Sequence, residues 1–304
     1  MMLVTRLQRR SFLSSMVVGG FCGLTRRPSM AIEPIRRAKN KQLKLSLAAY
    51  SMRQCFIRAP GTDGALDLAG FIDYCASLNL EGAELTQYYF PEQVTAEYLH
   101  QLKRRAHLAG IDITGGAIGN KFTLDPGEAL EKQMVYTKTW IRHYATLGAP
   151  VIRVFAGAPP AGVSEDEAIE RAIPALQEAC ECAAEHGIML AIENHDFTSK
   201  IDRLLKIIQR VDSPWLGVNF DSGNLSYSED PYADMQRMAP YTVNAQLKVA
   251  IHAAQGQQKA DLPRIVEILR AADYAGYLVL EYEANEDPYQ AIPRYVDQLR
   301  KIVG

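Results

Sequence analysis

Three acidic residues of the 304-residue sequence, Glu193, Asp221 and Glu281, each stand at the end of a mainly apolar run. Like charges that converge in a low-dielectric cavity raise one another's pKa, so three acids stay ionised there only beside a positive partner. A divalent cation is a natural partner for such a set. For any one of these acids alone, a solvated loop residue is the simpler interpretation. The three together predict a metal site, provided that the fold brings them to one place.

The pattern along the chain predicts how they are brought together. Short apolar runs rich in β-formers alternate with stretches of helical period, which predicts a parallel sheet. The predicted strands cover residues 45–50, 82–85, 112–116, 151–156, 189–193, 216–221, 243–248 and 278–281. The predicted helices cover residues 66–78, 96–109, 129–147, 165–186, 200–210, 231–238, 262–272 and 289–302.

Strand–helix units of this number, in roughly 270 residues, match the fold class α/β and a single (β/α)8 TIM barrel. A doubly wound sheet is the alternative, but residues 51–54 after the first strand contain no glycine for a phosphate-binding turn. In a TIM barrel the carboxyl ends of the strands converge on one mouth. The three acids therefore belong to the fifth, sixth and eighth strand ends of that mouth.

Four phrases at the ends of the fifth to eighth predicted strands carry a family resemblance: Ile192-Glu193-Asn194-His195, Asp221-Ser222-Gly223-Asn224, Gln246-Leu247-Lys248 and Leu280-Glu281-Tyr282-Glu283. They resemble the xylose isomerase-like TIM-barrel superfamily of sugar phosphate isomerases and epimerases. Members of that superfamily commonly hold one divalent metal with a glutamate, an aspartate, a histidine and a glutamate from strands five to eight. The resemblance implies the ligands Glu193, Asp221, Gln246 and Glu281.

Gln246 departs from the family pattern, because an amide oxygen stands where a histidine nitrogen is common. A set of oxygen ligands favours Mg²⁺ or Mn²⁺, with Ca²⁺ or Zn²⁺ less expected. The departure also leaves open a second interpretation, in which the barrel has lost its metal and only binds carbohydrate.

The resemblance implies proton-transfer chemistry beside a carbonyl. The metal would polarise the substrate carbonyl and stabilise an enediolate, with Glu193 and Glu281 as acid and base. Lys248 would steady an oxyanion or simply neutralise the acids. The predicted function is a sugar isomerase or epimerase, and the alternative is a 3-keto-glycoside lyase or hydratase with the same chemistry.

Further polar residues near the predicted mouth are candidates for substrate binding, although a polar loop residue is the simpler interpretation of each. They are His195, Glu283, Arg53, Glu84, Asn120 and Lys121.

Residues 1–31 differ in composition from the rest, with five arginines and no acid. Arg9-Arg10 precedes an apolar stretch at 13–24, and Ser29-Met30-Ala31 offers small residues for cleavage, which together predict a twin-arginine export signal. A disordered basic arm is the alternative. The prediction divides the chain into a signal (1–31), a linker (32–42) and the barrel (43–304), and implies a periplasmic or extracellular protein.

Charge and hydropathy restrict the partners. Cleavage after Ala31 would leave 28 basic and 35 acidic residues, a net charge near −7 that repels nucleic acid. The same charge, with few histidines at the mouth, argues against the apurinic endonuclease branch of the superfamily. No other apolar run approaches the roughly 20 residues that span a bilayer, so we expect no stable membrane anchor.

The expected partner is a small-molecule carbohydrate, and the resemblance implies a homo-oligomer. Cys55, Cys75, Cys180 and Cys182 make a poor disulfide framework for a domain of this size, and we expect buried thiols.

Overall fold

The computed structural model describes residues 33–37 and 42–304. The predicted signal (1–31) and residues 32 and 38–41 of the predicted linker lie outside the described residues, so the export signal stays a prediction. Among the described residues, no helix combines the length and the apolar composition needed to cross a bilayer. The four described cysteines are free and buried, as predicted.

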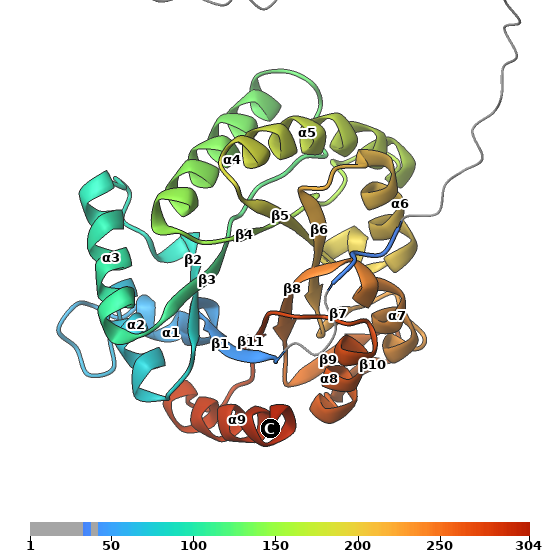
Figure 1. Ribbon diagram of the computed structural model, residues 1–304. Coiled ribbons are helices and arrows are strands. Elements are labelled where there is room, and N and C mark those ends of the chain that lie inside the picture. Colours follow the sequence, from blue (N-terminus) through green and yellow to red (C-terminus); the bar gives the residue numbers. More distant parts are fainter. Residues whose placement is uncertain (1–32, 38–41) are drawn as a thin grey trace, which may run out of the picture. The chain divides into compact units, whose positions relative to one another are not determined.

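In the described part of the chain, eight parallel strands close into a barrel in the order β1-β11-β8-β6-β5-β4-β3-β2 (Figure 1). The strands are β1 (Lys44–Ala48), β2 (Gly82–Thr86), β3 (Asp112–Ala117), β4 (Val151–Val154), β5 (Met189–Glu193), β6 (Leu216–Asp221), β8 (Thr242–Leu247) and β11 (Tyr277–Leu280). This closure confirms the prediction of a single (β/α)8 barrel.

Helices surround the strands (Figure 1). They are α2 (Leu68–Ser77), α3 (Ala96–Ala109), α4 (Glu128–Leu147), α5 (Glu165–Glu185), α6 (Ile201–Val211), α7 (Pro231–Met238), α8 (Leu262–Ala271) and α9 (Pro288–Val303). Side-chain oxygens of Asp67, Thr95 and Ser164 cap the first turns of α2, α3 and α5. Gly110 and Gly148 end α3 and α4 in the left-handed conformation, which turns the chain back toward the next strand.

Several short elements have no counterpart in the prediction. The strands β7 (Asn224–Leu225), β9 (Ala250–Ala253) and β10 (Gly256–Lys259) form a small sheet of their own. The other short elements are η1 (Ala49–Met52), α1 (Arg53–Phe56), η2 (Gln87–Tyr89), η3 (Asp196–Ser199) and η4 (Ala239–Tyr241). These segments are too short or too polar for a hydrophobic period to develop.

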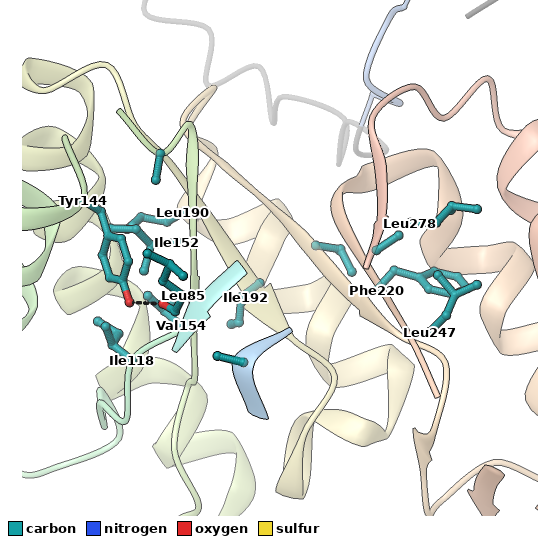
Figure 2. Close-up of a cluster of buried hydrophobic side chains, with 14 of the residues drawn as sticks. Leu85, Ile118, Tyr144, Ile152, Val154, Leu190, Ile192, Phe220, Leu247 and Leu278 are labelled. Carbon is teal, nitrogen blue, oxygen red and sulfur yellow. Dashed lines mark hydrogen bonds between the residues drawn. The ribbon is translucent and has the colours of Figure 1, made fainter. Parts of the chain in front are cut away.

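The alternation of each strand sorts its side chains between the barrel interior and the helices. Leu85, Ile152, Leu190 and Ile192 belong to the apolar cluster on the helix side, where the Tyr144 hydroxyl of α4 donates to the Leu85 carbonyl (Figure 2). Their sequence neighbours, such as Glu84, Arg153 and Glu193, consequently face the interior. The hydrophobic layer outside the strands thus fixes which polar groups lie inside.

Gly116 on β3 is the point at which Tyr144 reaches the sheet. A Cβ atom at this position would overlap the Tyr144 ring, which is fully buried. We expect Gly116→Ala to lower the free energy of unfolding by about 1–3 kcal/mol or more, because overpacking forces the ring out of place. Urea denaturation measures the change.

Gly70→Ala on α2 is the matched control, since its added methyl group would meet atoms only at 3.3 Å and beyond. We expect the control to change stability by less than about 1 kcal/mol. Equal urea midpoints for Gly116→Ala and Gly70→Ala would show that Gly116 is not required for the packing of Tyr144.

Candidate functional site

The strand ends deliver the predicted side chains to the barrel interior. Glu193 and Asp221 are the last residues of β5 and β6, Gln246 lies on β8, and Glu281 directly follows β11. All four are at most 5 % exposed. The register pairs Asp221 with Gln246 on the neighbouring strand. The fold therefore brings the four strand ends together as expected, while their contacts differ from those of a metal site.

Lys248, the residue after β8, lies at the centre of the acids. Its Nζ atom is 3.1 Å from Asp221 Oδ2, 3.3 Å from Glu281 Oε2 and 2.9 Å from Glu283 Oε1. The lysine side chain is 8 % exposed. An ammonium group has three N–H donors, and here it faces three carboxylates. We call these four residues the Lys248 cluster.

Burial and charge shift the pKa values within the Lys248 cluster. Burial raises the pKa of Asp221 and of Glu281 to about 7, although the positive charge of Lys248 acts in the opposite direction. Burial lowers the pKa of Lys248, but Asp221, Glu281 and Glu283 more than offset this and raise that pKa above its usual value. Lys248 therefore stays a cation, while its two buried partners titrate near neutral pH.

The loop after β6 holds Asp221 and Lys248 in place. Asp221 Oδ1 accepts from the backbone nitrogens of Gly223 (2.7 Å) and Asn224 (3.1 Å). The backbone nitrogen of Lys248 donates to Ser222 Oγ at 2.8 Å. A Cβ on Gly223 would lie 2.6 Å from Lys248 Cδ, so the glycine makes room for the lysine stem.

Glu193 has a different cationic partner, Arg153 of β4. Arg153 Nε lies 2.8 Å from Glu193 Oε2 in an ion pair that is not an aligned hydrogen bond, and both side chains are buried. The guanidinium also donates to the Ile118 carbonyl (2.8 Å) and lies 3.9 Å from the Phe155 ring centroid. Asn224 Nδ2 bridges Glu193 Oε1 (3.0 Å) and Asp221 Oδ2 (2.9 Å), which links this pair to the Lys248 cluster.

A network of amides around Glu84 engages Gln246. Glu84 accepts from Gln246 Nε2 (2.7 Å) and from Asn244 Nδ2 (2.8 Å). Asn219 Nδ2 donates to Gln246 Oε1 (2.6 Å) and its own oxygen accepts from Asn244 (2.8 Å). Because a carboxylate only accepts, Glu84 fixes the orientation of all three amides. Both ends of the Gln246 amide are thereby used.

The residues in this arrangement do not fit the predicted divalent ion. Gln246 directs its nitrogen to Glu84 and its oxygen to Asn219, so the oxygen that was expected to be a metal ligand is engaged by a protein amide. Lys248 already contacts Asp221 and Glu281, and Arg153 contacts Glu193. Among the described residues, no group of three or more histidine, cysteine or acidic side chains is arranged to hold a metal.

The remaining predicted residues lie in varied surroundings. Arg53 donates to the carbonyls of Tyr282 (3.0 Å) and Glu283 (3.3 Å), and the Asn120 amide makes two hydrogen bonds with the Phe155 backbone. Both side chains therefore hold loops of the mouth. Glu84 lies within the amide network and is 1 % exposed. The assignment of these three residues as substrate contacts stays a prediction.

The last three predicted residues are accessible. Glu283 belongs to the Lys248 cluster with a side chain that is 34 % exposed. The His195 side chain is 38 % exposed, with its ring centroid 4.6 Å from that of Phe155. Lys121 is exposed and does not belong to the Lys248 cluster.

Sequence reasoning did not identify Arg153 or Asn224. The signal for Arg153 is a lone cation inside the apolar run at 151–156, which implies a buried anionic partner. Asn224 lies three residues after Asp221, on a strand of two residues that no period reveals.

The family model described as xylose isomerase-like TIM barrel matches residues 72–301. The chain belongs to this family. A search of curated proteins found no match to this chain.

Solved structures of the same fold share little sequence with it. The 3-keto-D-glucoside 4-epimerase from E. coli is 15 % identical, with 86 % of this chain and 100 % of that one covered and a TM-score of 0.65. The probable 3-DHS dehydratase AsbF from Bacillus anthracis is 18 % identical, with 85 % and 99 % covered and a TM-score of 0.64. The IolI protein with a bound zinc atom is 13 % identical, with 86 % and 96 % covered and a TM-score of 0.68. Likeness at this identity establishes the fold alone.

The raised carboxyl pKa values predict a pH dependence of stability. With a pKa near 7 in the folded protein, against ordinary values of 3.8 and 4.5, Asp221 and Glu281 bind more protons when folded. Their contribution to stability is fully present below about pH 4 and is lost as the pH rises through about 7. Between about pH 5 and pH 8 the free energy of unfolding should fall less steeply in Asp221→Asn than in the wild type. The free energy of unfolding is measured by urea denaturation at each pH. The same dependence on pH in both proteins would contradict a raised pKa of Asp221.

The buried Arg153–Glu193 pair predicts a strong effect of breaking one side of it. Arg153→Met should lower the free energy of unfolding by about 3–5 kcal/mol, because it leaves Glu193 as an uncompensated buried charge. The double variant Arg153→Met/Glu193→Gln should recover part of that loss. Equilibrium unfolding of the wild type, the single variants Arg153→Met and Glu193→Gln, and the double variant measures the coupling energy of the pair. Additive effects of the two substitutions would argue against the ion pair.

Proposed function

We propose that this protein is an enzyme that moves a proton at the carbon beside the carbonyl of a carbohydrate, as an isomerase or epimerase. The observation that carries the proposal is the Lys248 cluster, in which two buried carboxyls have a pKa of about 7. General acid–base catalysis is most effective when the pKa lies near the working pH. Strongly perturbed acids that gather at the strand ends of a barrel are typical of an active site.

The proposed roles follow the contacts. A carboxylate removes the proton from the carbon, the electron pair moves onto the carbonyl oxygen, and the resulting enediolate oxygen faces the Lys248 ammonium. Glu281 and Glu193 are the candidates for removing and returning the proton. Return to the opposite face of the same carbon gives an epimer, and return to the neighbouring carbon gives an isomer.

Loss of a β-substituent from the same intermediate would instead give elimination, so a lyase or hydratase is the second candidate function. The structural similarity to a probable dehydratase favours keeping it, alongside the similarity to a 3-keto-D-glucoside epimerase. The export signal predicted at residues 1–31 supports an unphosphorylated substrate such as a 3-keto-glycoside, because sugar phosphates are mainly cytoplasmic. The product distinguishes the two reactions.

Deuterium exchange tests the proposal. We expect the enzyme, incubated in heavy water with a panel of 3-keto-glucosides and ketohexoses, to introduce deuterium at the carbon beside the carbonyl of the substrate it converts. Proton NMR follows the exchange. Glu281→Gln should slow it by about 10²- to 10⁴-fold, because a group that transfers the proton is lost.

Glu92→Gln, at an exposed residue outside the cluster, is the matched control and should exchange at the wild-type rate. Turnover without deuterium would refute proton transfer at that carbon. Sugar binding with neither turnover nor exchange would point instead to the non-catalytic carbohydrate-binding barrel.

A further inference from the structure

Lys248 Nζ lies among strand-end acids, two of which, Asp221 and Glu281, are predicted metal ligands. We infer that its ammonium group is the built-in cation of this site and that the protein works without a divalent metal ion. The catalytic part of this inference rests on the proposed function, whereas the statement about the metal stands on the geometry of the cluster. The lysine ammonium group therefore takes the place of the divalent metal ion that the three acids predict.

The competition between Lys248 and a metal is direct. Nζ lies within 3.3 Å of carboxylate oxygens from Asp221 at the end of β6 and from Glu281 and Glu283 after β11. A divalent ion takes carboxylate oxygens at about 2.0–2.6 Å, so an ion that used these three acids would overlap Nζ. The lysine would have to leave before a metal could enter.

Several contacts keep the lysine from leaving. Its backbone nitrogen is held by Ser222, and its stem passes over Gly223. Its side chain is 8 % exposed, and a buried ammonium group without partners is costly. The stem and its acceptors thus form one fixed unit.

The other two predicted ligands are also committed elsewhere. Glu193 faces the Arg153 guanidinium at 2.8 Å. The Gln246 amide is used at both ends, by Glu84 and Asn219. Each of the three predicted acidic ligands thus has a cationic side chain of the protein beside it.

The same cluster leaves an entry for substrate. The Asp221 side chain is 0 % exposed and that of Glu281 is 7 % exposed, whereas that of Glu283 is 34 % exposed. A carbonyl oxygen can therefore replace Glu283 as the third acceptor of Lys248 while the two buried acids stay. In that position it receives an N–H and a full positive charge as negative charge develops on it.

Manganese binding, measured without substrate, tests the inference. Full-length wild-type protein freed of metals, Lys248→Met and Lys301→Met are titrated with MnCl2, and free Mn²⁺ is followed by electron paramagnetic resonance. Lys301→Met removes the same charge from an exposed side chain of α9 and is the matched control. We expect the wild type and the control to bind no Mn²⁺ below about 1 mM. Lys248→Met should bind one ion at least about tenfold more tightly, because three carboxylates have lost their cation.

Two results would overturn the inference. One is a wild-type protein that binds one Mn²⁺ at micromolar concentration, a result that does not depend on how any variant folds. The other is a Lys248→Met variant, folded by circular dichroism, that binds Mn²⁺ no better than the wild type. The gained affinity should disappear in Lys248→Met/Asp221→Asn. The Mn²⁺ titration tests this inference without substrate, and the deuterium exchange tests the proposed function. A contradicting result in one experiment is therefore distinguishable from a contradicting result in the other.

Discussion

Charge balance among buried side chains of the barrel interior is the constraint on which this site depends. A buried carboxylate or ammonium group is tolerated only when an opposite charge and hydrogen bonds replace the lost water. Lys248 meets that requirement for Asp221, Glu281 and Glu283, and Arg153 meets it for Glu193. Removing either cation leaves acids that must take up protons, find another cation or distort the fold. The identity of that cation is therefore the main chemical question about the protein.

The rest of the fold keeps these charges at fixed positions. The apolar side chains that pack toward the helices determine, through strand alternation, which polar side chains face inward. The amides around Glu84 are oriented by that carboxylate, which places Gln246 as part of the interior framework. Oriented dipoles and charges of this kind need little rearrangement when charge develops on a substrate, which is the main requirement for electrostatic catalysis.

Much of this architecture could be predicted from the sequence. The predicted barrel strands and helices are present with ends shifted by at most two residues, because their hydrophobic periods are clear. The location of Glu193, Asp221 and Glu281 at strand ends on one mouth of the barrel followed from the geometry of parallel barrels. The contacts could not be predicted, since they depend on residues far apart in the sequence. Glu84 orients Gln246 across 162 positions, and Lys248 contacts Glu283 across 35. The hydrogen bonds of Arg53 and Asn120 to backbone groups were also not predicted; they arise because loop groups that lack strand partners need hydrogen bonds.

The most direct measurement of the central claim is anomalous diffraction at the manganese edge from crystals of the wild-type protein grown in MnCl2. We predict that Lys248 Nζ lies among Asp221, Glu281 and Glu283 with no anomalous peak between them. A manganese peak bound by these acids, with the lysine displaced, would contradict it.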